Sequence, residues 1–155
     1  MIALLKSFLK EELWEIDVIY HVQDRSPCML AHLLRQVDVV ITPHGFQSMI
    51  LLFLPRPSLL FEVFPYRYYK RGYAPLGNEY GIYHHGVMSP ARSWTHQLLL
   101  AQTVTSECMQ SKTCRNYGRN DNVYFTRHGL NRLKEAVEKL LADAKMTEKR
   151  DVLYV

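Results

Sequence analysis

Residues 37–64 read VDVVITPHGFQSMILLFLPRPSLLFEVF, and this segment predicts two buried strands joined by a helix. It begins with an apolar run, Val37 to Thr42, without polar–apolar alternation, which indicates a strand buried on both faces. Pro43-His44-Gly45 breaks this strand, and Phe46 to Leu54 predicts a helix that ends before a proline. Ser58 to Phe64 is again short and apolar, and predicts a second buried strand.

The residues before this stretch continue the alternation of helix and strand. Apolar periodicity predicts a helix over 2–13, and a β-branched run predicts a strand over 16–22. Ser26 as N-cap and Pro27 in the first turn predict a helix over 28–36. Helices alternating with strands across short connections predict an α/β domain with a Rossmann-like parallel sheet and flanking helices.

The pattern loosens after Pro65. We expect a loop over 66–75, a short strand over 81–87, a helix over 91–101, an irregular segment over 102–122, a last strand over 123–126 and a closing helix over 130–144. The closing helix has the clearest signal, because leucine and valine recur in it at helical spacing. We therefore expect one domain over 1–145, followed by a loosely held tail over 146–155.

Composition limits the class of protein. The chain has 155 residues, of which 48% are hydrophobic and 22% charged, with a net charge of +4. This favours a single globular domain over a disordered chain. The mild positive charge suits an anionic ligand such as a nucleotide and does not require nucleic acid. No apolar run reaches the roughly 18 to 20 residues of a membrane span, and the N-terminus does not resemble a signal peptide.

Cysteine and histidine give little sign of a metal site. Cys28, Cys108 and Cys114 form no Cys-x-x-Cys motif, which argues against zinc. We favour three free thiols over a Cys108–Cys114 disulfide, which would form in an oxidising lumen. His84 and His85 are adjacent in a predicted strand and so face opposite ways. We expect no metal and no essential metal cofactor.

The first candidate site lies at the end of the first buried strand. A helix following His44-Gly45 would present free backbone N–H groups and the positive end of its dipole to a phosphate. Gly45 would allow close approach, and Ser48 would add a hydroxyl donor. The alternative is an ordinary glycine turn with a hydrogen-bonded histidine. The segment matches neither the Gly-x-Gly-x-x-Gly fingerprint nor a P-loop, and the chain has no Gly-x-Ser-x-Gly elbow.

The second candidate site lies at the end of the next strand. Glu62 stands in a strongly apolar strand, where an unpartnered carboxylate is costly. It could accept bonds from ribose hydroxyls, or it could be a structural residue that caps a nearby helix or pairs with Arg67. The aromatic and basic run 66–73 could stack a base or hold a phosphate. It would also suit single-stranded nucleic acid, or form a surface loop.

Taken together, these motifs resemble the C-terminal part of glycosyltransferase family 61. The resemblance covers roughly residues 14–142 and is densest between 37 and 70. It rests on Asp38 to Ile41 with His44-Gly45, Leu52-Phe53-Leu54-Pro55, Phe61 to Tyr66 and Tyr69-Lys70, with support from Tyr80 to Tyr83 and from Cys114 near Arg119. It implies the C-terminal, donor-binding lobe of a GT-B enzyme that transfers a sugar with inversion from a nucleotide sugar, a UDP sugar, to a glycan or protein hydroxyl.

The resemblance also implies roles for single residues. His44 and Gly45 would line the donor diphosphate, Ser48 would stand at the helix start, Glu62 would lie near the ribose, and Tyr66 and Lys70 would flank the pocket. No residue is assigned as catalytic. The family's His-Gly-Ala-Gly is His44-Gly45-Phe46-Gln47 in this chain, which could narrow the donor site or change the donor. The family's first strand and N-terminal lobe, with the acceptor site, are missing, so we expect a truncated chain with little activity alone.

The resemblance places the protein in the secretory pathway, in the Golgi or ER lumen. One alternative is a degenerate lobe that serves protein–protein contact, with self-association through an open sheet edge. A weaker alternative is binding of single-stranded nucleic acid through residues 66–73, although we expect no nucleic-acid partner.

Overall fold

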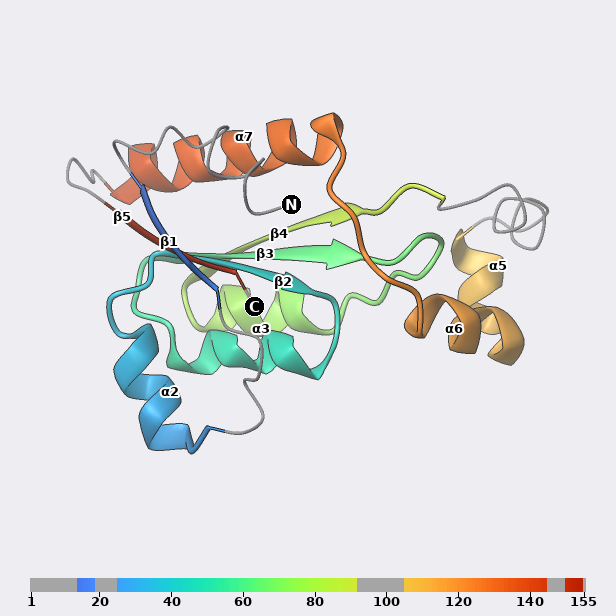
Figure 1. Ribbon diagram of the computed structural model, residues 1–155, viewed down its shortest axis with the longest axis horizontal. Helices are drawn as coiled ribbons and strands as arrows, with labels where there is room; N and C mark the ends of the chain where they lie inside the picture. The colour runs from blue at the N-terminus through green and yellow to red at the C-terminus, as the bar shows by residue number, and fades with distance from the viewer. Residues whose placement is uncertain (1–13, 19–24, 92–104, 145–149, 155) are drawn as a thin grey trace.

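The computed structural model describes residues 14–18, 25–91, 105–144 and 150–154. Its centre is a five-stranded sheet with the order β1-β5-β2-β3-β4, and every pairing among these strands is parallel (Figure 1). The strands are β1 (Trp14–Val18), β2 (Val39–Pro43), β3 (Ser58–Phe64), β4 (Ile82–Met88) and β5 (Arg150–Tyr154). The predicted α/β class with a Rossmann-like parallel sheet is confirmed.

Helices cover both faces of this sheet (Figure 1). The described helices are α2 (Pro27–Leu34), the 3-10 helix η1 (Phe46–Phe53), α3 (Tyr73–Glu79), α5 (Thr105–Gln110), α6 (Lys112–Arg119) and α7 (Arg127–Ala144). The elements α2, η1 and α3 pack on one face, and α7 packs on the other. Helices α5 and α6 lie beyond the carboxyl ends of β3 and β4 (Figure 1). None of the helices in the described ranges is long and apolar enough to cross a membrane.

The core is double because β2 and β3 are buried on both faces. Successive side chains of a strand point to opposite faces. Phe61 therefore packs against α7, including Leu133, while Leu60 packs against α2 and η1, including Leu34. Each of these residues is fully buried. Both strands have unbroken apolar sequences because neither face of either strand is exposed to water.

Several predicted elements differ from the structure. Helix α3 begins inside the predicted loop 66–75, because Pro75 falls in its first turn, where proline is tolerated. The predicted irregular segment 102–122 contains α5 and α6, the second capped by Ser111, whose hydroxyl accepts from the backbone N–H of Cys114 at 3.3 Å. The predicted helix over 46–54 is a 3-10 helix.

The expectations for 123–126 and for the tail were wrong. Backbone 123–126 forms no strand, since the N–H and C=O of Tyr124 bond the Ser89 hydroxyl, at 2.8 and 3.2 Å, instead of a neighbouring strand. In the expected tail, β5 pairs with both β1 and β2, with Val152 in register with Ile16 and Val39. The predicted helix over 2–13, residues 19–22 of the first predicted strand and residues 92–101 of another predicted helix lie outside the described residues.

Candidate functional site

Glu62 is the centre of a buried polar cluster within the apolar core. Its side chain has no exposed surface. Oε1 accepts hydrogen bonds from Nδ1 of His44, at 3.0 Å, and from the hydroxyl of Ser48. Oε2 lies 2.6 Å from Nε2 of His84. Both carboxylate oxygens are therefore occupied by partners within the chain, as a buried charge requires.

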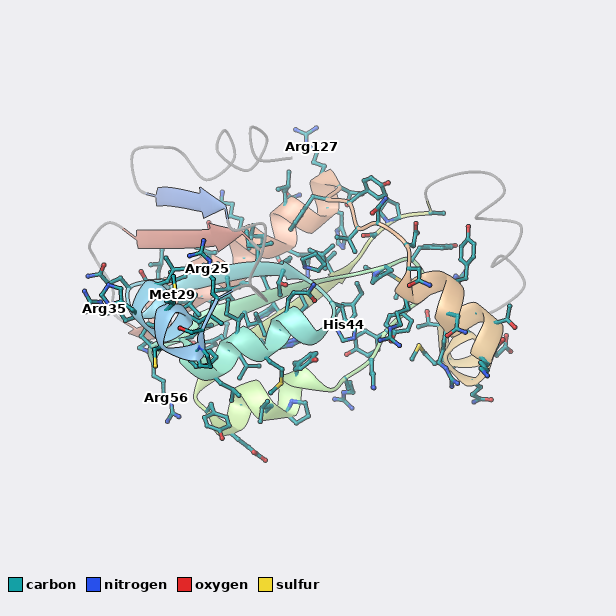
Figure 2. All side chains as sticks on the ribbon, turned by 60° about the horizontal axis from the view of Figure 1, so that its bottom comes forward. Arg25, Met29, Arg35, His44, Arg56 and Arg127 are labelled. Carbon is teal, nitrogen blue, oxygen red and sulfur yellow. A yellow bond between two sulfur atoms is a disulfide. The ribbon has the colours of Figure 1, made fainter. Side chains whose placement is uncertain are left out.

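Three elements bring these side chains to one place. His44 follows β2 directly, and its backbone N–H donates to the carbonyl of Val63 at 2.9 Å. Figure 2 places His44 where β2 ends and η1 begins, at the opposite end of the sheet from Arg35 and Arg56. Ser48 is buried in the first turn of η1.

His84 completes the cluster and was not among the predicted site residues. It stands on β4 in register with Leu60, two positions before Glu62 on β3, so alternation puts all three side chains on the same face. The signal in the sequence was the pair His84-His85 itself. The sequence pattern tests this pair only against a metal site, although a buried carboxylate on the neighbouring strand also needs donors.

The cluster keeps Glu62 charged. Burial alone would raise the pKa of this carboxyl group, but the hydrogen bonds from His44, His84 and Ser48 outweigh it and lower the pKa from 4.5 to about 2. A charged carboxylate only accepts hydrogen bonds, so the ring nitrogens that face it carry protons. In the neutral rings, Nε2 of His44 and Nδ1 of His84 are therefore the acceptors.

Aromatic rings enclose His44. Its ring stacks on Phe64 with centroids 4.6 Å apart and is tilted against Tyr68 and Tyr73, each at 5.7 Å. The imidazole is only 5% exposed. Burial, together with the negative charge of Glu62 and the nearby Tyr68, raises the pKa of Tyr73, so its hydroxyl stays protonated. The imidazole is thus held in a fixed orientation and tautomer.

Gly45 does not need to be a glycine for conformational reasons. Its φ of 162° is extended backbone, which any residue adopts. A Cβ added there would lie 2.7 Å from Oε1 of Gln47, so the Gln47 side chain folds back over the Gly45 backbone. Gln47 is exposed. Its Oε1 lies where a side chain at position 45 would begin, and this is the position where the chain departs from His-Gly-Ala-Gly.

The predicted site residues thus divide into two groups. The structure brings His44, Ser48 and Glu62 into contact, with Gly45 next to them. Tyr66 packs instead against Cys108 and Cys114, and Lys70 is exposed. For Glu62, the geometry favours pairing within the protein, although its partners are histidine and serine, not Arg67. The buried carboxylate offers no surface to a ribose hydroxyl.

A disulfide joins Cys108 of α5 to Cys114 of α6, so our preference for free thiols was wrong for this pair. The turn between the two helices brings the Cα atoms to 5.2 Å, within the normal range for a disulfide. Cys28 is free and exposed. Within the described ranges, no group of three or more His, Cys, Asp or Glu residues is arranged to hold a metal ion.

Comparisons with known protein families and with curated proteins found no match for this chain. The relationship to glycosyltransferase family 61 therefore rests on the sequence motifs and stays a prediction.

Proposed function

We propose that this lobe binds the donor, a UDP sugar, for an inverting glycosyltransferase related to family 61. The observation that carries the proposal is the contact between His44 and Glu62, 18 positions apart, whose side chains meet at 3.0 Å. The two motifs that resemble the family are thereby joined at the carboxyl ends of β2 and β3. Ligands of open α/β sheets bind beyond this end of the strands.

In this proposal Glu62 is a positioning residue. It holds Nδ1 of His44, so that only Nε2 of this ring, on a side chain that is 5% exposed, could bind a ligand. As an imidazolium, His44 would donate from Nε2 to a phosphate oxygen, and the buried Glu62 carboxylate would stabilise its charge. The hydroxyl of Ser48 is directed at Glu62, so Ser48 supports the cluster and does not donate to the phosphate.

The transfer needs one site that binds the donor and its leaving diphosphate, and another that activates the acceptor hydroxyl. The acceptor oxygen attacks the anomeric carbon, the bond from that carbon to the diphosphate breaks, and UDP leaves with the electron pair. A general base elsewhere must take the proton of the acceptor hydroxyl, and we assign no residue of this chain to that role. The role proposed here is to bind the leaving diphosphate. The acceptor would be a glycan or protein hydroxyl.

The disulfide supports a location in the secretory pathway, in the ER or Golgi lumen. Disulfides form and persist in oxidising compartments and are rare in the cytosol. The link between Cys108 and Cys114 joins two short helices near Tyr66. It therefore fits a protein that folds in an oxidising lumen.

Calorimetry with UDP tests the proposal. The chain is expected to bind UDP with saturable heat, and His44→Ala is expected to weaken binding about tenfold, or ~1.4 kcal/mol. His128→Ala is the control, because His128 is exposed on α7, on the other face of the sheet. Absence of heat at about 1 mM UDP, a concentration that detects a binding free energy of about 4 kcal/mol, would count against the proposal.

The position of Gln47 favours a second candidate function, a degenerate lobe used for protein contact. Its side chain covers the Gly45 backbone, where a donor phosphate would approach. If the chain binds no UDP, sedimentation should show a concentration-dependent oligomer, as expected for pairing at a sheet edge. A monomer at every concentration would contradict self-association.

A further inference from the structure

Arg67 has an unusual backbone. It follows β3 in the loop that leads past the Glu62 cluster, and with φ 61° it is the one non-glycine residue with a left-handed backbone in the described ranges. Arginine adopts this conformation only where the surroundings impose it. Its backbone N–H donates to the sulfur of Met88 at 3.3 Å, which ties the loop to the end of β4. Such strain is concentrated at functional sites.

The Arg67 side chain is incompletely satisfied. Its guanidinium lies over the ring of Tyr66, 5.3 Å from the ring centroid. The Nε–H is buried and has no hydrogen-bond partner among the residues that the structure describes. A buried, unpaired donor on a charged group is costly, and such a donor in a native structure calls for an explanation such as strain, a functional role, or a bound water or ion.

The surroundings of this loop favour an anion. Lys70 and Arg71 are exposed in the same loop, and Arg119 is exposed at the end of α6. Helix α6 packs closely on the loop, since a Cβ added to Gly118 would lie 2.9 Å from Cβ of Tyr68. The carboxylate of Glu62 is sealed by its own partners, so it leaves these cations free to attract a ligand.

We propose that Arg67 anchors an oxyanion site for a phosphoryl group. A guanidinium binds two oxygens of a phosphate in parallel, from Nε–H and one terminal N–H, and the ring of Tyr66 would hold its plane. Because Nε is buried, the guanidinium must rotate over the Tyr66 ring before its Nε–H can reach the anion. This inference rests on the proposed function in taking the phosphoryl group as part of the UDP diphosphate. It adds Arg67 to His44 as a second group that binds this diphosphate.

Pyrophosphate is the probe that isolates this site from the uridine. The full chain is expected to bind pyrophosphate, with a shift of the Arg67 Nε–H resonance in NMR spectra. Arg67→Lys keeps the positive charge but loses the two parallel N–H donors of the guanidinium. It should weaken pyrophosphate binding about tenfold. Arg71→Lys, at an exposed position in the same loop, is the control and should change it less than about twofold.

A second variant separates binding from folding. Arg67→Asn tolerates the left-handed backbone, so it should unfold at the same urea concentration as the parent chain and still lose pyrophosphate affinity. Wild-type affinity in Arg67→Lys and Arg67→Asn, or no pyrophosphate binding by the parent chain at about 10 mM, overturns the inference. Pyrophosphate binding that depends on Arg67 but gains nothing from uridine supports the inference and contradicts the UDP proposal. UDP binding that is unchanged in Arg67→Lys contradicts the inference and leaves the UDP proposal standing.

Discussion

Nδ1 of His44 lies 3.0 Å from Oε1 of Glu62, and both side chains are buried within an apolar core. This contact joins the end of β2 to β3, and His84 extends it to β4 through the other carboxylate oxygen. One carboxylate therefore links three elements across the sheet. The stability of the fold and the orientation of the candidate site depend on the same group.

Replacing Glu62 should cost stability. In Glu62→Gln an NH2 group replaces one carboxylate oxygen. This NH2 group then faces a histidine N–H that also donates, so a hydrogen bond becomes a repulsive contact. We expect a loss of about 3 kcal/mol in the free energy of unfolding, measured by urea denaturation. Glu135→Gln is the matched control: Glu135 pairs with Arg132 at 2.8 Å on the exposed surface and should cost less than about 0.5 kcal/mol. Equal losses in the two variants would show that the cluster contributes no special stability.

The lowered pKa of Glu62 makes the free energy of unfolding depend on pH in the acid range. Its pKa falls from 4.5 to about 2 on folding, so the unfolded chain binds the proton first. The contribution of this group is complete above pH 4.5 and is lost as the pH falls toward 2; it amounts to about 3 kcal/mol. Urea denaturation over this range should show the parent chain losing stability more steeply than Glu62→Gln. Parallel curves for the two chains would contradict the pKa assignment.

The two central strands could be predicted because the signal for each is local. Val37 to Thr42 and Ser58 to Phe64 are short apolar runs, and a strand with both faces buried needs nothing else. Glu62 could also be recognised, because a carboxylate in such a run must have partners. The identity of those partners depends on strand register, and His84, on the next strand, is 22 positions away.

Other elements depend on contacts that a local pattern does not contain. The strand β5 is five residues at the end of the chain, and what makes it a strand is its position between β1 and β2. The helices α5 and α6 are short and polar, and the disulfide between Cys108 and Cys114 holds them together. Sequence periodicity detects a helix such as α7 because its apolar face repeats over 18 residues.

Removing the Gln47 side chain should open the candidate donor site. Gln47→Ala leaves the Gly45 backbone uncovered and restores a small residue at the position where the family has one. Calorimetry should show UDP affinity rising by about fivefold, or ~1 kcal/mol. Gln36→Ala is the control, because Gln36 is exposed just after α2, before β2 begins. An unchanged UDP affinity in Gln47→Ala would contradict an approach of the donor phosphate to the Gly45 backbone.

Breaking the disulfide should loosen the part of the protein that supports the Tyr66–Arg67 loop. Cys108 and Cys114 close a short loop, for which chain entropy predicts a loss of about 2 kcal/mol when the bond is removed. Tyr66 packs on this disulfide, so Cys108→Ser with Cys114→Ser should weaken pyrophosphate binding as well as lower the urea midpoint. Cys28→Ser removes the free, exposed thiol and should change neither. Alkylation without reductant followed by mass spectrometry should label Cys28 alone, and labelling of all three cysteines in the chain as purified from an oxidising compartment would contradict the disulfide.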